Sequence, residues 1–243
     1  NCRANAELAA RGPFAHIHVG PAAHDAGTAA GAAWHLYAAA ANRAIPRQQP
    51  VRVACSGPSP QRLLSDPWSG WQRVRPSSGL DTVTRWLSAG EAVGWIDGRG
   101  EFGPRALGRR SLLAAPSSHG VVERMNRLKG RHWFEPLALA VPQERAQDIF
   151  EIPAPARGLT AYMLVTVRPR SDWHRRLAHL LHGDGTVRLQ TVSRGNHPRF
   201  HALLRAMAHV SGLPLLINTS FNPRGQAMPA TAAQALPLAE ALG

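Results

Sequence analysis

Two segments of the chain carry basic side chains in settings suited to binding an anion. Residues 98–111 flank Arg105 with glycines, so that backbone and guanidinium could approach one phosphate or carboxylate together. Residues 126–136 place the only lysine of the chain, Lys129, close to Arg131. Each segment also has a structural interpretation: the first as a glycine-rich hairpin with solvated arginines, the second as a basic helix end favoured by the helix dipole.

Two further segments combine polar side chains with strand patterns. Residues 182–192 read as a turn followed by a strand, whose alternation places Arg188 and Gln190 on one face. Residues 216–222 read as the end of a strand leading into a loop that contains Asn218 and Ser220. Ligands commonly bind at strand ends, although each segment alone is more typical of an ordinary turn. Neither a P-loop nor a dinucleotide-binding fingerprint is present.

Taken in order, these four segments resemble the C-terminal domain of the O-carbamoyltransferases, which include enzymes acting on nodulation factors, cephamycins and aminoglycoside antibiotics. The resemblance spans nearly the whole chain, and residues 1–5 and 21–33 are similar to the end of that family's preceding, Kae1-like domain. It implies a YrdC-like domain that converts carbamoyl phosphate and ATP, with Mg²⁺, into carbamoyl adenylate. The Kae1-like domain would then pass the carbamoyl group to a hydroxyl of a secondary metabolite or sugar, as in antibiotic biosynthesis.

The resemblance also implies roles for individual residues. Arg105 and Lys129 would be the catalytic cations that contact the carbamoyl-phosphate and phosphate oxygens. Arg188 would hold the adenylate, and Ser220 and Asn218 would bind the nucleotide. Asp25 matches an iron(II) ligand of the full-length family, but the histidines that complete that site are missing here, so we do not expect this chain to hold iron.

Two differences from the family pattern bear on activity. Where the family has Phe-Arg-Pro, this chain has Phe134-Glu135-Pro136, so a carboxylate replaces an anion-binding arginine. Glu135 would repel the phosphate, and Arg131 is the candidate substitute cation. Gln226 replaces a family glutamate. Two alternatives therefore stay open: a degenerate nucleotide-binding pseudoenzyme, and an RNA-binding module, which YrdC-like folds resemble.

Composition narrows the possible partners. The formal net charge is +13, which attracts polyanions, but the chain has no long basic block and no interleaving of basic and aromatic residues. This pattern argues against nucleic acid, and the family resemblance implies carbamoyl phosphate and ATP as the partners. No run of eighteen apolar residues and no signal-peptide pattern occur, so we expect no membrane partner and a cytoplasmic location.

The remaining pattern predicts an α/β or α+β fold, because strands and helices alternate along the chain. Strands are expected at residues 14–19, 92–96, 136–141, 161–167, 186–192 and 213–217, and helices at 29–41, 80–89, 121–128, 143–150 and 198–210. We predict the end of the Kae1-like domain at 1–60, a proline-rich linker at 61–78, and a YrdC-like twisted mixed sheet at 79–243. His197 and His201 have the spacing of a helical zinc pair, but a partly exposed helix face is the favoured interpretation.

Overall fold

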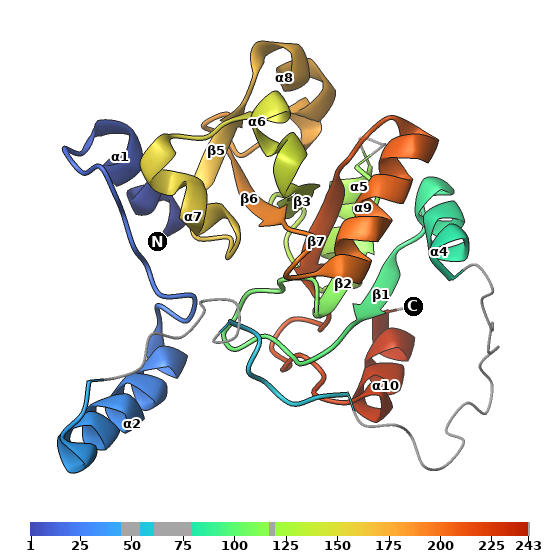
Figure 1. Cartoon of the computed structure of the whole chain (residues 1–243). Helices are drawn as coiled ribbons and strands as arrows, with labels where there is room; N and C mark the ends of the chain where they lie inside the picture. Colours follow the sequence, from blue (N-terminus) through green and yellow to red (C-terminus); the bar gives the residue numbers. More distant parts are fainter. Residues whose placement is uncertain (45–53, 61–78, 117–119, 243) are drawn as a thin grey trace.

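A seven-stranded mixed sheet forms the centre of the protein, in the order β1-β2-β7-β3-β6-β5-β4 (Figure 1). The computed structural model describes residues 1–44, 54–60, 79–116 and 120–242. The strands are β1 (Val93–Ile96), β2 (Arg110–Ala114), β3 (Ala138–Pro142), β4 (Phe150–Glu151), β5 (Thr166–Pro169), β6 (Val187–Val192) and β7 (Leu216–Ser220). β3 and β6 run parallel, and the other described pairs are antiparallel. The predicted mixed α/β fold is confirmed.

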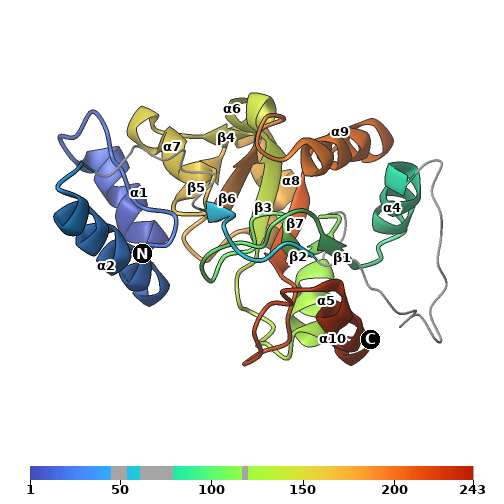
Figure 2. The same cartoon turned by 60° about the horizontal axis from the view of Figure 1, so that its bottom comes forward.

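Helices lie on both sides of this sheet (Figure 2). They are α1 (Cys2–Arg11), α2 (Asp25–Ala41), α4 (Gly79–Ser88), α5 (Val121–Leu128), α6 (Ala146–Ile149), α7 (Arg157–Thr160), α8 (Ser171–Leu177), α9 (Pro198–Ser211) and α10 (Ala232–Leu242), with short 3₁₀ turns at Gln143–Arg145, Ala154–Ala156 and Ala178–Leu180. α9 begins at a proline, which suits a first helical position, and ends at Gly212 in the left-handed conformation. None of these described helices is long and apolar enough to cross a membrane.

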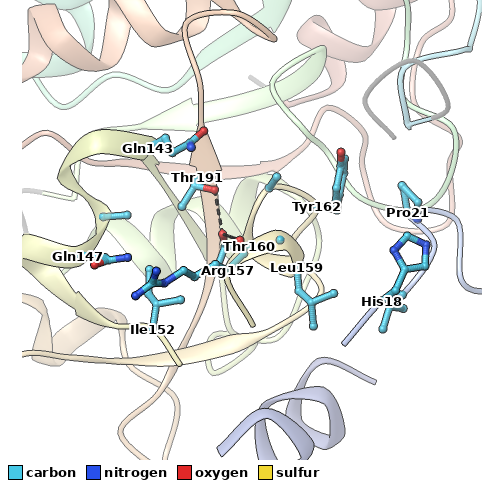
Figure 3. Close-up of a pocket in the computed structure, with 14 residues that line it drawn as sticks. His18, Pro21, Gln143, Gln147, Ile152, Arg157, Leu159, Thr160, Tyr162 and Thr191 are labelled. Carbon is cyan, nitrogen blue, oxygen red and sulfur yellow. Dashed lines mark hydrogen bonds between the residues drawn. The ribbon is translucent and has the colours of Figure 1, made fainter. Parts of the chain in front are cut away.

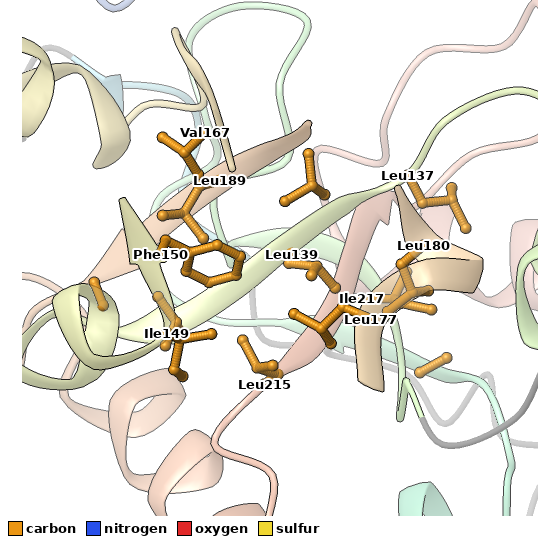
Figure 4. Close-up of a cluster of buried hydrophobic side chains, with 14 of the residues drawn as sticks. Leu137, Leu139, Ile149, Phe150, Val167, Leu177, Leu180, Leu189, Leu215 and Ile217 are labelled. Atoms are coloured by element: carbon orange, nitrogen blue, oxygen red, sulfur yellow. The ribbon is translucent and has the colours of Figure 1, made fainter. Parts of the chain in front are cut away.

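One face of the sheet carries the larger hydrophobic core. Leu139 of β3, Leu189 of β6 and Ile217 of β7 point to this face, where they pack with Ile149 and Phe150 (Figure 4). Helices α5, α8 and α10 also contribute to this cluster, and removing such side chains from water stabilises the fold by roughly 1.5–3 kcal/mol each.

The opposite face is divided between an apolar part and a polar part. Helices α4 and α9 cover the apolar part, with Phe200 and Leu204 of α9 packed on Leu113 and Leu216. The same face of β6 and β7 carries polar residues further along each strand. This polar part is where the predicted site residues emerge.

Several expected elements differ from those observed. Residues 14–19 do not pair with another strand. Ile17 and Val19 pack against the main core, and this packing explains the alternation of apolar and polar residues that predicted a strand. Of residues 161–167, expected as a strand, 161–163 instead continue the turn after α7, and β5 begins only at Thr166. Met163 at φ 56° marks this change of direction.

Other corrections concern boundaries. Residues 143–150 form a 3₁₀ turn and the short helix α6 rather than one helix, and α2 begins at Asp25 rather than residue 29. β7 extends to Ser220, so Asn218 and Ser220 belong to the strand and not to a following loop. The predicted linker at 61–78 lies outside the described residues.

Candidate functional site

The glycine-rich loop that presents Arg105 is organised by Glu101. One carboxylate oxygen of Glu101, Oε1, accepts hydrogen bonds from the backbone N–H groups of Leu107 (2.7 Å), Arg109 (2.8 Å) and Arg110 (3.0 Å). An ionised acceptor bonded to several backbone donors is a strong local constraint. Glu101 therefore closes the loop, and Arg105 is left partly exposed at its tip.

The two arginines that follow are engaged within the protein. Arg109 forms an ion pair with Asp97, with 3.2 Å between Nη1 and Oδ2. Arg110 is buried, and its guanidinium donates to the backbone carbonyls of Pro58, Gly98, Arg109, Pro229 and Ala230. Of the arginines in this segment, Arg105 is therefore the one available to a ligand in the neighbouring cavity.

Lys129 directs its side chain from the end of α5 towards the end of β7. Its Nζ donates to the Ser220 carbonyl, to Ser220 Oγ (3.2 Å) and to the carbonyl of Asn222 (2.5 Å). Burial, followed by the positive charge of Arg131, lowers the Lys129 pKa to about 8. Lys129 does lie at the C-terminal end of α5, as the helix-end interpretation requires, but it is only 3% exposed and its ammonium is directed to the end of β7.

Arg188 reaches the same region from β6. Burial, and then the positive charge of Arg105, lower the Arg188 pKa to about 10, so the guanidinium remains charged at neutral pH. Its buried Nε has no hydrogen-bond partner within the described part of the chain. A desolvated cation with a free donor suits an incoming anion.

Arg131 forms an ion pair with Glu135. The Arg131 Nε lies 2.8 Å from Glu135 Oε2, and the backbone N–H of His132 donates to Glu135 Oε1 at 3.0 Å. The hydrogen bond from Arg131, and next that from His132, lower the pKa of Glu135, which is therefore ionised at neutral pH. Arg131 is thus present in the site, but it is paired with the carboxylate that replaces the family arginine.

These side chains converge on one cavity of about 300 Å³. All six residues predicted for substrate binding line it, namely Arg105, Lys129, Arg131, Arg188, Asn218 and Ser220. Arg224 also lines this cavity and was not predicted, because nothing in its local sequence distinguishes it from a solvated arginine. The cavity therefore gathers five cationic side chains with one carboxylate, Glu135, an arrangement that can bind a small phosphorylated anion.

A second cavity, of about 430 Å³, lies between residues 18–21 and α7 (Figure 3). The hydroxyls of Thr160 and Thr191, 2.9 Å apart, lie in its wall, together with His18 and Arg157. It contains none of the six predicted residues. Although larger, this cavity has one arginine where the first has four arginines and a lysine, so the first is the better candidate for anion chemistry.

The metal expectations can be tested against the side chains present. Asp25 is the exposed first residue of α2, and among the described residues no group of three or more His, Cys, Asp or Glu side chains could hold a metal ion. His201 bonds Glu144 through Nε2 at 2.9 Å. His197 and His201 are each 5% exposed, so the expectation of a partly exposed helix face is wrong. Burial, and then Arg109, lower the His197 pKa to about 4.

The fold and this cavity define an α/β protein with a strongly cationic cavity at the ends of its strands. Comparison with known proteins specifies it further. A family model described as the carbamoyltransferase C-terminus matches residues 84–242, and one described as the carbamoyltransferase N-terminus matches residues 1–34. The chain belongs to the carbamoyltransferase family.

Curated relatives show how much of a family member the chain represents. It is 38% identical over 229 residues to nodulation protein NolO of Bradyrhizobium diazoefficiens, covering 91% of this chain and 41% of NolO. It is 34% identical over 226 residues to nodulation protein U of Azorhizobium caulinodans, covering 93% of this chain and 38% of that protein. The chain thus spans about two fifths of the length of these relatives.

Among solved structures, full-length HypF in a phosphate- and nucleotide-bound form is similar with a TM-score of 0.51. The identity is 14%, over 70% of this chain and 21% of HypF. At this identity the similarity supports the fold alone.

Proposed function

We propose that this chain forms carbamoyl adenylate from carbamoyl phosphate and ATP, as the activating part of an O-carbamoyltransferase. The observation that carries the proposal is the convergence of Arg105, Lys129 and Arg188, from three separate segments, on one cavity. Both substrates are anions, so their approach to each other requires fixed positive charge.

The balance of atoms requires one water molecule. Hydrolysis of carbamoyl phosphate releases inorganic phosphate and carbamate; a carbamate oxygen then attacks the α-phosphorus of ATP, and pyrophosphate leaves. Arg105 and Lys129 would bind the phosphate oxygens, Arg188 would hold the adenylate phosphate, and Ser220 would bind the nucleotide. ATP enters as its Mg²⁺ complex. Because both substrates are cytoplasmic metabolites, we also propose a cytoplasmic location.

The test is pyrophosphate exchange into ATP that depends on carbamoyl phosphate. We expect exchange by the wild-type chain, and a loss of at least about 100-fold in Lys129→Met, because the buried ammonium is removed from the site. Arg127→Met removes an exposed cation from the same helix and serves as the matched control. Exchange that is unaffected by Lys129→Met, or that proceeds without carbamoyl phosphate, would argue against the proposal.

A second candidate is a nucleotide-binding protein without turnover. It is favoured by Glu135, whose carboxylate lines the cavity and pairs with Arg131. Glu135→Arg separates the two: a gain in exchange identifies a weakened carbamoyltransferase, whereas nucleotide binding with no exchange in either form identifies the second candidate.

The names of the relatives bear on the acceptor. Both relatives described above are nodulation proteins, which favours an acceptor connected with nodulation over the antibiotic acceptors that the family resemblance also includes. The chain spans two fifths of these proteins, so the acceptor is a property of the longer protein.

A further inference from the structure

Asn218 lines the cationic cavity and carries a buried hydrogen-bond acceptor that is unused. The residue is 1% exposed, and its buried Oδ1 has no hydrogen-bond partner in the described ranges. Its Nδ2 donates to Gln190 Oε1 at 2.7 Å and to the carbonyl of Ala106 at 3.2 Å. Both amide hydrogens are therefore used, and the oxygen is the atom left for a ligand.

The orientation of this amide is fixed by its neighbours. Gln190 donates from Nε2 to the Leu107 carbonyl at 2.9 Å, so its own oxygen faces Asn218. If the Asn218 amide were flipped, its oxygen would face two acceptors, Gln190 Oε1 and the Ala106 carbonyl. The sheet and the glycine-rich loop thus hold Oδ1 in the acceptor position.

A buried acceptor without a donor is unfavourable by about 1–3 kcal/mol. Such groups in native structures call for an explanation, and a donor that arrives with the substrate supplies one here. The ligand group near Asn218 should therefore carry an N–H or O–H.

The sheet register places this acceptor beside the cations. Ala138 of β3 pairs with Arg188 on one side and Asn218 on the other, so both polar side chains emerge on the same face. Ser220, two residues along β7, shares that face and lies 3.2 Å from Lys129 Nζ through its Oγ. A small molecule whose phosphate lies on the cations would bring its other end to Asn218.

Carbamoyl phosphate has this pattern, with a phosphate at one end and an amide NH₂ at the other. Acetyl phosphate has nearly the same shape but carries a methyl group in place of the NH₂. We propose that Asn218 Oδ1 accepts a hydrogen bond from the carbamoyl NH₂ and thereby selects carbamoyl phosphate over acyl phosphates. The inference rests on the proposed function and adds the basis of its substrate selectivity.

The experiment titrates the whole chain, without nucleotide, with carbamoyl phosphate, acetyl phosphate and inorganic phosphate. Omitting nucleotide removes the ribose and adenine donors that could also reach Asn218. We expect the wild-type chain to bind carbamoyl phosphate at least about tenfold more tightly than acetyl phosphate. In Asn218→Leu we expect the affinities for carbamoyl phosphate and acetyl phosphate to become equal, and the inorganic phosphate titration measures the loss that all three anions share when the Asn218–Ala106 hydrogen bond is removed.

A second variant acts without altering Asn218. Gln190→Met removes the group that orients the amide, and we expect it to lower the ratio of the affinity for carbamoyl phosphate to that for acetyl phosphate. Equal wild-type affinities for carbamoyl and acetyl phosphate would overturn the inference whatever the variants do. So would a full preference retained in Asn218→Leu or Gln190→Met. If the wild-type chain binds none of the three anions, the proposed function itself fails.

Discussion

Lys129 is a cation whose surroundings partly oppose its charge. Burial and the nearby Arg131 lower its pKa to about 8, while oxygens of Ser220 and Asn222 accept its hydrogens. The ammonium form is therefore complete well below pH 8 and is lost as the pH rises above it. Within the site, Lys129 is the cation most sensitive to mildly alkaline pH.

The affinity for inorganic phosphate should consequently fall above pH 8, by up to about tenfold per pH unit if only the charged lysine binds. Lys129→Arg should flatten this decline, because a guanidinium stays charged throughout the range. The measurement is the phosphate affinity of both proteins by calorimetry between pH 7 and 9.5. Ionisation of the phosphate affects both proteins equally, so it does not contribute to the difference between them. Parallel profiles would contradict the assignment of Lys129 as the titrating group.

Glu135 opposes anion binding in the same cavity by occupying Arg131. We expect Glu135→Gln to raise the affinity for inorganic phosphate about three- to tenfold, since it removes a negative charge and releases the Arg131 guanidinium. Glu91→Gln breaks an exposed ion pair with Arg124 and should leave the affinity unchanged. An affinity that is lower in Glu135→Gln than in wild type would show that the Arg131–Glu135 pair supports binding.

At the scale of elements, the site depends on how the glycine-rich loop is tied to the sheet. The Glu101 carboxylate accepts hydrogen bonds from backbone N–H groups of the loop itself. The side-chain amides of Gln190 in β6 and Asn218 in β7 donate to backbone carbonyls of the loop. Close packing against α9 fixes the far end of the loop at Gly108. Loop and sheet therefore position Arg105 together.

Glu101→Ala should lower the free energy of unfolding by about 2–4 kcal/mol, because three backbone donors lose a charged acceptor. The Leu107 and Arg109 amides should also exchange faster, and phosphate affinity should fall as Arg105 loses its position. Glu123→Ala, on the exposed side of α5, is the control for urea denaturation. Unchanged exchange at Leu107 and Arg109 would show that Glu101 does not hold the loop.

Gly108→Ala tests the packing of the loop on α9. A Cβ at this position would lie 2.4 Å from Phe200 Cδ1, and the backbone has φ 83°, which disfavours alanine. We expect a loss of about 2–4 kcal/mol in unfolding free energy. Gly183→Ala, where no described atom lies within 4 Å of the new Cβ, should change it by less than about 0.5 kcal/mol. Similar effects of both substitutions would contradict the proposed clash.

The sequence predicted elements best where a local pattern coincided with burial. β6 and α9 were predicted almost to the residue, since one alternates before a clear turn and the other has a proline start and a glycine end. β2 was missed because it is buried on both faces and so lacks alternation. α10 was missed because Pro237 lies inside it.

The sequence predicted which residues line the candidate site, but it did not predict the hydrogen bonds and ion pairs among them. The order of four motifs identified the six cavity residues through the family resemblance, whereas each motif alone was ambiguous. The loop-closing role of Glu101 and the Arg131–Glu135 pair arise from tertiary contacts. Arg224 lines the same cavity, and its backbone N–H donates to the Lys129 carbonyl at 2.8 Å, a tertiary contact that its local sequence does not indicate.

At the scale of the whole molecule, the chain holds one family domain and a short part of another. The N-terminal family model matches only residues 1–34, and α2 lies away from the sheet with none of its described side chains buried (Figure 1). We therefore expect the chain to bind ATP weakly and to transfer no carbamoyl group to a hydroxyl, because it spans only about two fifths of the length of its curated relatives. Mass spectrometry of sugar acceptors incubated with the chain, carbamoyl phosphate and ATP checks this; any carbamoylated product would contradict it.

The position of bound carbamoyl phosphate tests the central claim most directly. In a crystal of the chain soaked with this compound, its phosphate should lie among Arg105, Lys129 and Arg188, in the cavity of about 300 Å³. A cavity that stays empty at saturating concentration, or a ligand bound instead beside His18 and Arg157, would contradict the assignment of this cavity as the carbamoyl-phosphate site.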